Sequence, residues 1–230
     1  MKVLAINSSP RKQSGNTALI LDPFLEGIKE AGGEVELVFS HDLLINPCRR
    51  CTEDSDFESK GKCECDDDMN DLYPKFRDAD IWIFAFPNYL NSMNANLKNL
   101  LDRMEPLFEV DFEAMAPQKI NGEKGKMVCV STCGFWDMKN FNLILAHMKE
   151  ISALFDRQFS GSLLRPHSWA LNALTELGFS VEHIYDSARR AGRELVNKGH
   201  ISDEAQEEVS QELVERDSFM NEIKDIKVKN

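Results

Sequence analysis

Five short apolar runs mark the chain, and each has the length of a β-strand. They lie at residues 3–6, 35–39, 81–86, 127–130 and 161–164. The run at 81–86 is continuous, as expected for a central parallel strand that is buried on both faces. Segments with apolar residues at helical spacing separate the runs. This alternation predicts an α/β fold with a doubly wound, five-stranded parallel sheet.

Helices are predicted between these runs, where apolar residues recur every three or four positions. The first follows Thr17 and stops at Gly32-Gly33, because glycine favours helix termination. The others lie at Met69–Arg77, from about Leu97, and at Asn140–Phe155.

The end of the chain is acidic and predicts two more helices, at Val181–Lys198 and Ser202–Ile223. The second has few large apolar residues, too few for a core of its own. We therefore divide the chain into a domain at 1–200 and a helical extension at 201–230. We expect the extension to pack on another subunit.

Polar loops follow three of the predicted strands. The carboxyl ends of parallel strands share one edge of the sheet, where α/β proteins bind ligands. The first loop, Asn7–Thr17, places hydroxyls, Arg11 and Lys12 beside the positive end of a helix, which suits a phosphate. An ordinary helix-capping corner is the alternative for this loop taken alone.

The second and third loops, Pro87–Met93 and Ser131–Trp136, add aromatic rings and small residues with backbone amides. With a phosphate site beside them, they suit a flat heteroaromatic group that carries a phosphate tail. Flavin mononucleotide (FMN) is such a group. Taken alone, Tyr89 or Trp136 is better explained as a partly buried aromatic residue.

Composition narrows the class of protein. The chain has 230 residues, of which 42% are hydrophobic and 29% charged, which suits one α/β domain with additions. The net charge of −12 disfavours nucleic acid or an anionic membrane as a general partner. No apolar run has the length of a membrane span, and we expect a cytoplasmic protein.

Four of the six cysteines crowd into the polar segment 46–68: Cys48, Cys51, Cys63 and Cys65. In a reducing compartment such crowding favours metal binding or redox chemistry over structural disulfides. An iron–sulfur cluster and tetrahedral zinc both accept four thiolates, so the spacing leaves both open, together with unligated thiols.

Several motifs occur together in the order found in one known family. Asn7-Ser8-Ser9-Pro10-Arg11-Lys12 with Gly15-Asn16-Thr17 resembles the phosphate loop of the NADPH-dependent FMN reductase family. Asp67-Asp68-Met69, Pro87-Asn88-Tyr89 and Lys98 with Asp102-Arg103 resemble its iron–sulfur flavoprotein branch. The resemblance covers residues 1–136 best. It implies a flavodoxin-like fold with a cysteine-rich loop insertion, bound FMN, NAD(P)H as electron donor and a homodimer or homotetramer.

The resemblance also implies which residues bind the cofactors. The phosphate would be held by Ser8, Ser9, Arg11, Ser14, Asn16 and Thr17. One flank of the flavin ring would be bordered by Pro87, Asn88, Tyr89, Asn91 and Ser92. Its other flank would be bordered by Thr132, Cys133 and Gly134.

The cysteine motif of the branch is matched in part. Cys48 and Cys51 match its first pair and Cys63 its last position, whereas Asp54 stands at the third and Cys65 is additional. We expect an iron–sulfur cluster at Cys48, Cys51, Cys63 and Cys65, with zinc or no metal as the alternatives.

The expected function is an FMN-dependent NAD(P)H oxidoreductase that passes electrons to a second acceptor. The flavin does the chemistry in such an enzyme, so no catalytic side chain is assigned. The alternative is a non-enzymatic flavin electron carrier that partners ferredoxin. A hydrolase or transferase is disfavoured, because no nucleophile with a base at a suitable spacing stands out.

Overall fold

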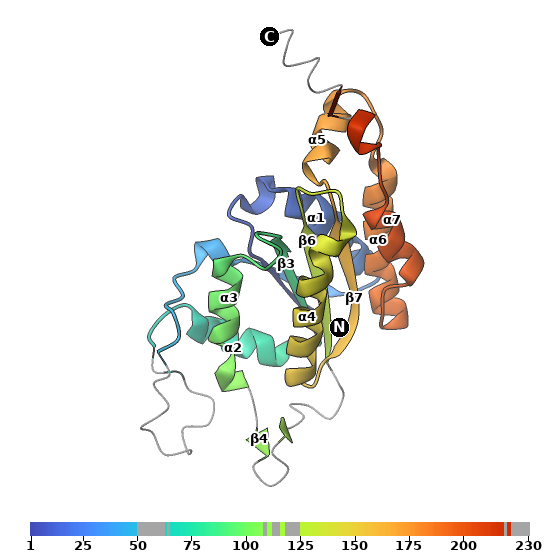
Figure 1. Ribbon diagram of the computed structural model, residues 1–230. Coiled ribbons are helices and arrows are strands. Elements are labelled where there is room, and N and C mark those ends of the chain that lie inside the picture. The colour runs from blue at the N-terminus through green and yellow to red at the C-terminus, as the bar shows by residue number, and fades with distance from the viewer. Residues whose placement is uncertain are drawn as a thin grey trace.

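The computed structural model describes residues 1–49, 63, 65–107, 110–111, 116–117, 125–218 and 220–221. A five-stranded parallel sheet forms its centre, in the strand order β2-β1-β3-β6-β7 (Figure 1). The strands are β1 (Lys2–Asn7), β2 (Glu34–Phe39), β3 (Ile81–Pro87), β6 (Lys126–Thr132) and β7 (Gln158–Arg165). Each of the five predicted runs lies inside one of them, which confirms the doubly wound parallel sheet.

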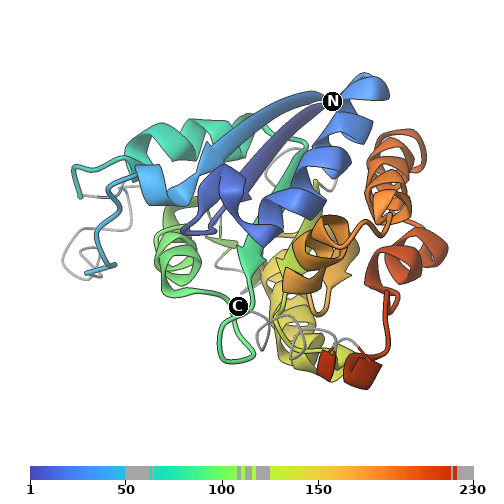
Figure 2. The same cartoon turned by 90° about the horizontal axis from the view of Figure 1, so that it is seen from above.

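Helices cover both faces of the sheet (Figures 1 and 2). Successive side chains of a strand point to opposite faces, so Val3 and Ala5 belong to one core cluster and Leu4 and Ile6 to the other. The first cluster includes side chains of α1 (Asn16–Glu30), α5 (Trp169–Glu176), α6 (Glu182–Lys198) and α7 (Asp203–Ser210). The second includes side chains of α2 (Met69–Asp78), α3 (Ala95–Asp102) and α4 (Asn142–Leu154).

Helices α1 and α6 pack backbone to backbone at a pair of glycines. A Cβ atom on Gly27 would lie 1.9 Å from the backbone oxygen of Arg189, and one on Gly192 would lie 2.2 Å from that of Phe24. Neither position has room for a side chain. The two glycines therefore set how closely α6 approaches the helix that follows the first loop.

Some elements differ from the prediction. Helix α5 and the short antiparallel pair β4 (Val110–Asp111) and β5 (Ala116–Pro117) were not predicted. The last predicted helix was expected to reach residue 223, but α7 ends at Ser210. It ends where the Arg165 guanidinium takes the carbonyl groups of Val209 and Gln211 as hydrogen-bond acceptors.

The C-terminal segment packs on its own chain as far as Val214. Ala205 and Val209 are fully buried in the core cluster that α1 and α6 share, and Leu213 and Val214 pack against that cluster. Its side chains thus add to the core of the preceding residues. The division of the chain at residue 200 stays a prediction.

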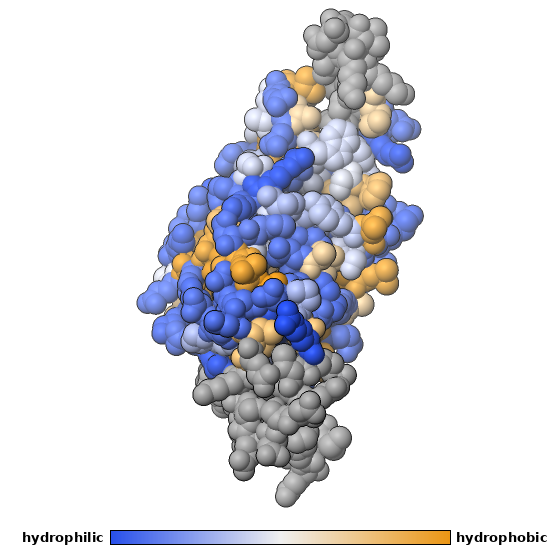
Figure 3. All heavy atoms as spheres, turned by 90° about the vertical axis from the view of Figure 1, so that its left-hand side faces the viewer, coloured by the Kyte–Doolittle hydropathy of each residue, from blue (hydrophilic) through white to orange (hydrophobic). Residues whose placement is uncertain are grey.

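The face of the molecule in Figure 3 is mostly hydrophilic, with smaller apolar patches between polar side chains. In the part of the chain that the structure describes, no helix combines the length and the apolar character needed to cross a bilayer.

Candidate functional site

The first loop is a compact turn between β1 and α1. The Ser9 N–H donates to Oδ1 of Asn7 at 2.9 Å, and the Lys12 N–H donates to the Ser9 carbonyl at 2.9 Å. Gly15 comes so close to this turn that a Cβ atom would lie 2.5 Å from Oγ of Ser9. A side chain at this position would therefore displace the Ser9 hydroxyl.

The start of α1 is left uncapped by side chains. Gly15 is its N-cap residue, and no side chain accepts a hydrogen bond there from the first turn. The first N–H groups of a helix lack partners within the helix and carry partial positive charge. They are accordingly suited to an anion.

Three hydroxyl groups of the predicted phosphate site, those of Ser8, Ser9 and Thr17, belong to buried residues. Oγ1 of Thr17 lies 3.0 Å from Oγ1 of Thr132, so the first and third loops meet here. Ser14 differs: it is exposed, and its hydroxyl donates back to the Arg11 carbonyl at 2.8 Å.

The cations of the first loop do not act alike. Nζ of Lys12 forms an ion pair with Asp42, outside the loop. Arg11 is exposed. Asn16 donates through Nδ2 to Oγ of Ser168 at 3.3 Å, which ties the first loop to the residues that follow β7.

The second loop is joined to the third. The Asn88 N–H donates to the Thr132 carbonyl at 2.8 Å, and Asn88 Nδ2 donates to the Asn140 carbonyl at 2.9 Å. Pro87 pairs with Thr132 across β3 and β6. These contacts bring the two predicted flanks of the ring to one edge of the sheet.

A tight turn forms the tip of the second loop. Tyr89 and Ser92 exchange two backbone hydrogen bonds, at 2.9 and 3.0 Å, around Leu90 and Asn91. Both central residues are left-handed, with φ of 53° and 59°. Leu90 is completely exposed and Tyr89 is 50% exposed, so the turn presents apolar surface to the outside.

The third loop is supported from behind by residues at the end of β7. The Cys133 N–H donates to the Arg165 carbonyl, the His167 N–H to the Phe135 carbonyl, and the Ser168 N–H to the Cys133 carbonyl. Burial raises the pKa of the Cys133 thiol. At neutral pH this cysteine is therefore a thiol, which agrees with a passive loop residue better than with a reactive one.

Arg165 and His167 form a buried polar pair at the end of β7. Their side-chain nitrogens NH2 and Nε2 lie 2.5 Å apart, and the His167 ring stacks on Trp136 with centroids 4.9 Å apart. Burial, with the charge of Arg165, lowers the pKa of His167 to about 4. The imidazole is therefore neutral and accepts at Nε2 from the guanidinium.

Sequence reasoning missed three residues that hold the first loop. Asn7 accepts from the Ser9 N–H, Ser40 donates through Oγ to Oγ of Ser8, and Asn94 donates through Nδ2 to the Ser8 carbonyl. Asn94 immediately precedes α3, so its position at a strand-to-helix connection was the available signal.

Buried polar atoms without a hydrogen-bond partner remain at these strand ends. In the described part of the chain they include Nδ2 of Asn7, Oδ1 of Asn94 and Oγ of Ser131. Such atoms are uncommon in folded proteins unless a ligand or water satisfies them. Together with the uncapped start of α1, they fit a bound group with a phosphate and several hydrogen-bonding atoms.

The predicted metal ligands are described only in part. Cys51 lies outside the described residues. Cys48 is exposed, whereas Cys63 and Cys65 are partly buried. Among the residues that the structure describes, no three His, Cys, Asp or Glu side chains come together as a metal site.

Cys63 has a cationic neighbour. NH2 of Arg103 donates to its sulfur at 3.3 Å. Burial works against the Cys63 thiolate, but the Cys65 N–H and the Arg103 guanidinium outweigh it and lower the pKa of the thiol. The same guanidinium lowers the pKa of the buried Asp67 carboxyl to about 2, against the effect of burial.

Comparison with known proteins places this arrangement in a family. A model of the NADPH-dependent FMN reductase family matches residues 1–139, which include all three loops. The chain belongs to this family. The resemblance of the opening loop to the FMN reductase family is thereby confirmed.

The curated relatives of this chain are named iron-sulfur flavoproteins. An iron-sulfur flavoprotein of Methanosarcina thermophila is 41% identical over 105 residues, which are 45% of this chain and 52% of that protein. One of Methanocaldococcus jannaschii is 38% identical over 107 residues, 46% of this chain and 53% of that protein. The chain spans about half the length of these curated relatives.

Solved structures agree on the fold of the family. An FMN-dependent NADH-azoreductase of Bacillus anthracis has a TM-score of 0.63 at 16% identity, with 85% of this chain and 99% of that one covered. An NAD(P)H:quinone oxidoreductase of Methanothermobacter marburgensis has a TM-score of 0.60 at 18% identity, with 85% and 96% covered. With the strand order described above, these similarities confirm the flavodoxin-like fold.

Proposed function

We propose that the protein is an FMN-dependent oxidoreductase that takes electrons from NAD(P)H and passes them to a second acceptor. The observation that carries the proposal is the junction of the three loops at one sheet edge, through Thr17 with Thr132 and Asn88 with Thr132. Membership in the FMN reductase family supports the choice of cofactor.

The phosphate of FMN would be held by the start of α1 and by the hydroxyls around it. Ser9 and Thr17 are buried at this helix terminus, in the first loop and in the first turn of α1. Hydrogen bonds to a charged group contribute roughly 1.5–3 kcal/mol each, so a few of them suffice for firm binding. The full set is Ser8, Ser9, Arg11, Ser14, Asn16 and Thr17.

The flavin ring would lie between the second and third loops. Bound FMN supplies the hydride and electron transfer. The protein contributes binding and orientation through Pro87, Asn88, Tyr89, Asn91 and Ser92 on one flank and Thr132, Cys133 and Gly134 on the other. Because these loops are tied together through backbone hydrogen bonds, they can hold the ring in one orientation.

The test combines a visible spectrum with turnover. We expect protein purified without oxygen to show flavin absorption, and we expect NADH or NADPH to reduce that flavin and sustain turnover with a quinone or a dye. Flavin that is reduced by dithionite but not by either nucleotide would support the electron-carrier alternative. Protein that stays colourless after incubation with FMN would contradict both and revive a hydrolase or transferase.

We further propose an iron–sulfur cluster at Cys48, Cys51, Cys63 and Cys65. The names of the curated relatives support it. The hydrogen bond that Arg103 donates to the Cys63 sulfur supports it as well, since hydrogen bonds to ligand sulfurs are typical of such clusters. A cluster beside a flavin would let two-electron transfer be divided into single steps.

Iron, zinc and sulfide analysis of protein purified without oxygen tests the metal. We expect iron and sulfide in wild type and their loss in Cys51→Ala and Cys65→Ala. Wild type without iron and sulfide would end the cluster proposal, and about one zinc per chain would establish zinc instead. Iron retained in Cys65→Ala but lost in Cys51→Ala would point to Asp54 or another group as the fourth ligand.

A further inference from the structure

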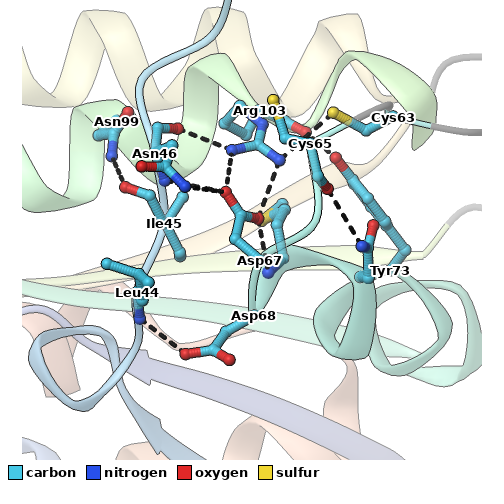
Figure 4. A network of polar contacts seen from close by, with 12 residues as sticks. Leu44, Ile45, Asn46, Cys63, Cys65, Asp67, Asp68, Tyr73, Asn99 and Arg103 are labelled. Atoms are coloured by element: carbon cyan, nitrogen blue, oxygen red, sulfur yellow. Dashed lines mark hydrogen bonds and ion pairs between the residues drawn. The ribbon is translucent and has the colours of Figure 1, made fainter.

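A buried ion pair links the cysteine-rich segment to the residue after α3 (Figure 4). NH1 of Arg103 lies 2.7 Å from Oδ2 of Asp67, and NH2 lies 3.0 Å from Oδ1. The side chain of Arg103 is 1% exposed and that of Asp67 is 0% exposed. Two parallel hydrogen bonds of this kind fix orientation as well as distance.

The pair holds three separate stretches of chain together. Arg103 follows α3, Asp67 precedes α2, and Asn46 lies after β2. The Asn46 carbonyl accepts from NH1 of Arg103 at 2.7 Å, while its N–H donates to Oδ2 of Asp67 at 2.9 Å. Each member of the pair therefore binds Asn46 as well as the other member.

The Cys63 sulfur belongs to the same network. NH2 of Arg103 has two N–H groups. It donates one to Oδ1 of Asp67 at 3.0 Å and the other to the sulfur of Cys63 at 3.3 Å. Figure 4 shows the Cys63 side chain next to this guanidinium. The carboxylate fixes the guanidinium, and the second N–H of NH2 is thereby directed at the sulfur.

Neighbouring contacts reinforce the junction. Asp67 also accepts from the Met69 N–H at 3.2 Å, and Asp68 accepts from the Leu44 N–H at 2.7 Å. Asn99 of α3 donates to the Ile45 carbonyl at 2.6 Å. These side-chain contacts, with the Asp68 N–H that donates to the Leu44 carbonyl at 3.2 Å, thus join the two ends of the cysteine-rich segment.

We propose that Arg103 is a positioning residue that, together with Asp67, joins the two ends of the cysteine-rich segment and fixes the Cys63 sulfur before any metal binds. A lysine could not replace it, because an ammonium is a point charge that cannot reach Asp67, Asn46 and Cys63 at once. One consequence rests on the proposed metal site: Arg103 would be a hydrogen-bond donor to a ligand sulfur there, a contact that tunes metal centres.

Amide hydrogen exchange on metal-free protein, purified with a chelator and a reductant, tests the proposal. The residues to follow are Asn46 and Met69, whose N–H groups donate to Asp67. We expect Arg103→Met and Arg103→Lys each to exchange about tenfold faster at both places than wild type. Residues 127–130 of β6 should exchange as in wild type. Because no metal is present, the result stands apart from the fate of the cluster proposal.

Lys98→Met is the matched control, since it removes a cation one turn earlier on α3 whose partner is the exposed Asp102. It should leave exchange at Asn46 and Met69 within about twofold of wild type. If the single Arg103 variants do not fold, the double variant R103M/D67N leaves no unpaired charge and keeps an amide oxygen at residue 67 as an acceptor for these N–H groups. Wild-type exchange at both places, rescue by lysine, or acceleration that extends to 127–130 would each overturn the proposal.

Discussion

Thr17 lies where the first and third loops meet, with its hydroxyl against that of Thr132. If Thr132 is the donor of that pair, the Thr17 hydrogen is left for a phosphate oxygen. We expect Thr17→Val to weaken FMN binding by roughly 1.5–3 kcal/mol, at least tenfold in Kd, and Ser9→Ala to act in the same direction. Titration of flavin fluorescence against apoprotein measures both.

The control for this substitution is Thr175→Val on α5, where the hydroxyl donates to Leu171 within the same helix. It should leave FMN affinity unchanged. Wild-type affinity in Thr17→Val, in Ser9→Ala and in the double variant would contradict the assignment of the first loop to the phosphate.

His167 gives stability a dependence on pH. Its pKa is lowered to about 4 in the folded chain by burial and by Arg165, whereas an unfolded histidine has a pKa of about 6.5. Below pH 6.5 the unfolded chain takes up a proton that the folded chain refuses. The contribution of His167 to the free energy of unfolding is therefore complete above about pH 6.5. It is lost as the pH falls to about 4, and the loss is about 3 kcal/mol in all.

Urea denaturation at several pH values between 4 and 8 measures this loss. His167→Asn should flatten the curve, and asparagine tolerates the left-handed backbone at this position, where φ is 37°. His200→Asn, at an exposed position, is the control. Equal slopes for wild type and His167→Asn would contradict the prediction.

Residues that follow a strand directly could be predicted from the sequence. Ser8, Ser9 and Thr132 stand beside apolar runs, and parallel strands bring such positions to one edge. The buried pairs could not be predicted as pairs. Arg103 and Asp67 are 36 residues apart, and Arg165 finds its acceptors 44 and 46 residues away. The residues next to them in the sequence do not indicate such a pairing.

The crossing of α1 and α6 depends on Gly27 and Gly192. We expect Gly192→Ala to destabilise the protein by about 1–3 kcal/mol, because the new methyl group would meet the backbone of Phe24 and force the helices apart. This loss should outweigh the gain of about 1 kcal/mol in helix propensity. Chemical denaturation gives the difference.

Asn197→Ala serves as the control for that crossing. It lies on α6 at an exposed position and raises helix propensity without a new contact. It should leave stability unchanged or raise it slightly. A Gly192→Ala protein as stable as Asn197→Ala would show that α6 can move away from α1 at no cost.

Elements with strong periodicity were predicted well, and elements that depend on distant partners were not. The continuous run at 81–86 is β3 almost residue for residue. The end of α7 could not be predicted, because it depends on Arg165, which is remote in the sequence and takes the last carbonyls. Helix α5 spans only Trp169–Glu176, too few residues for a clear helical period.

At the scale of the whole molecule, the residues from Ala205 to Val214 complete the core. A chain that ends after Ser202 loses Val209 and Gln211, whose carbonyls accept from the buried Arg165 guanidinium. NH1 of Arg165 would lose both acceptors, although NH2 and Nε keep His167 and Pro166, and the burial of Ala205 and Val209 would be lost as well. We expect this truncation to lower the melting temperature sharply, whereas a chain that ends after Glu215 should melt as the full chain does.

Melting curves of the two truncated chains and the full chain decide the matter. Equal melting temperatures for the full chain and the chain ending after Ser202 would show that the segment is dispensable for the core.

Subunit assembly is a separate prediction for the whole molecule. We expect a homodimer or homotetramer, and light scattering at micromolar concentration measures it. The truncation after Glu215 keeps the described core contacts, so a change of mass in that variant would assign assembly to the residues beyond. A full chain that stays monomeric would contradict the prediction.

The layered architecture was predictable at this scale because strands and helices alternate along the chain. The surface on which the C-terminal helices pack could not be predicted. The charged residues of 181–198 and 202–223 suggest an external face, but Ile184, Ala188, Ala191 and Leu195 are fully buried against α1 and the sheet. Periodicity shows that a helix has an apolar face, and it does not show which surface that face covers.

The glycine contact between α1 and α6 also bears on how sequences of this kind can diverge. A side chain at either position needs space that only a displacement of the other helix would provide. Residues at the positions of Gly27 and Gly192 should therefore change together among relatives. Either both are small, or both are larger. In a relative with a bulky residue at one of these positions, α6 would have to lie farther from α1. The residues at these two positions would then indicate the distance between the two helices.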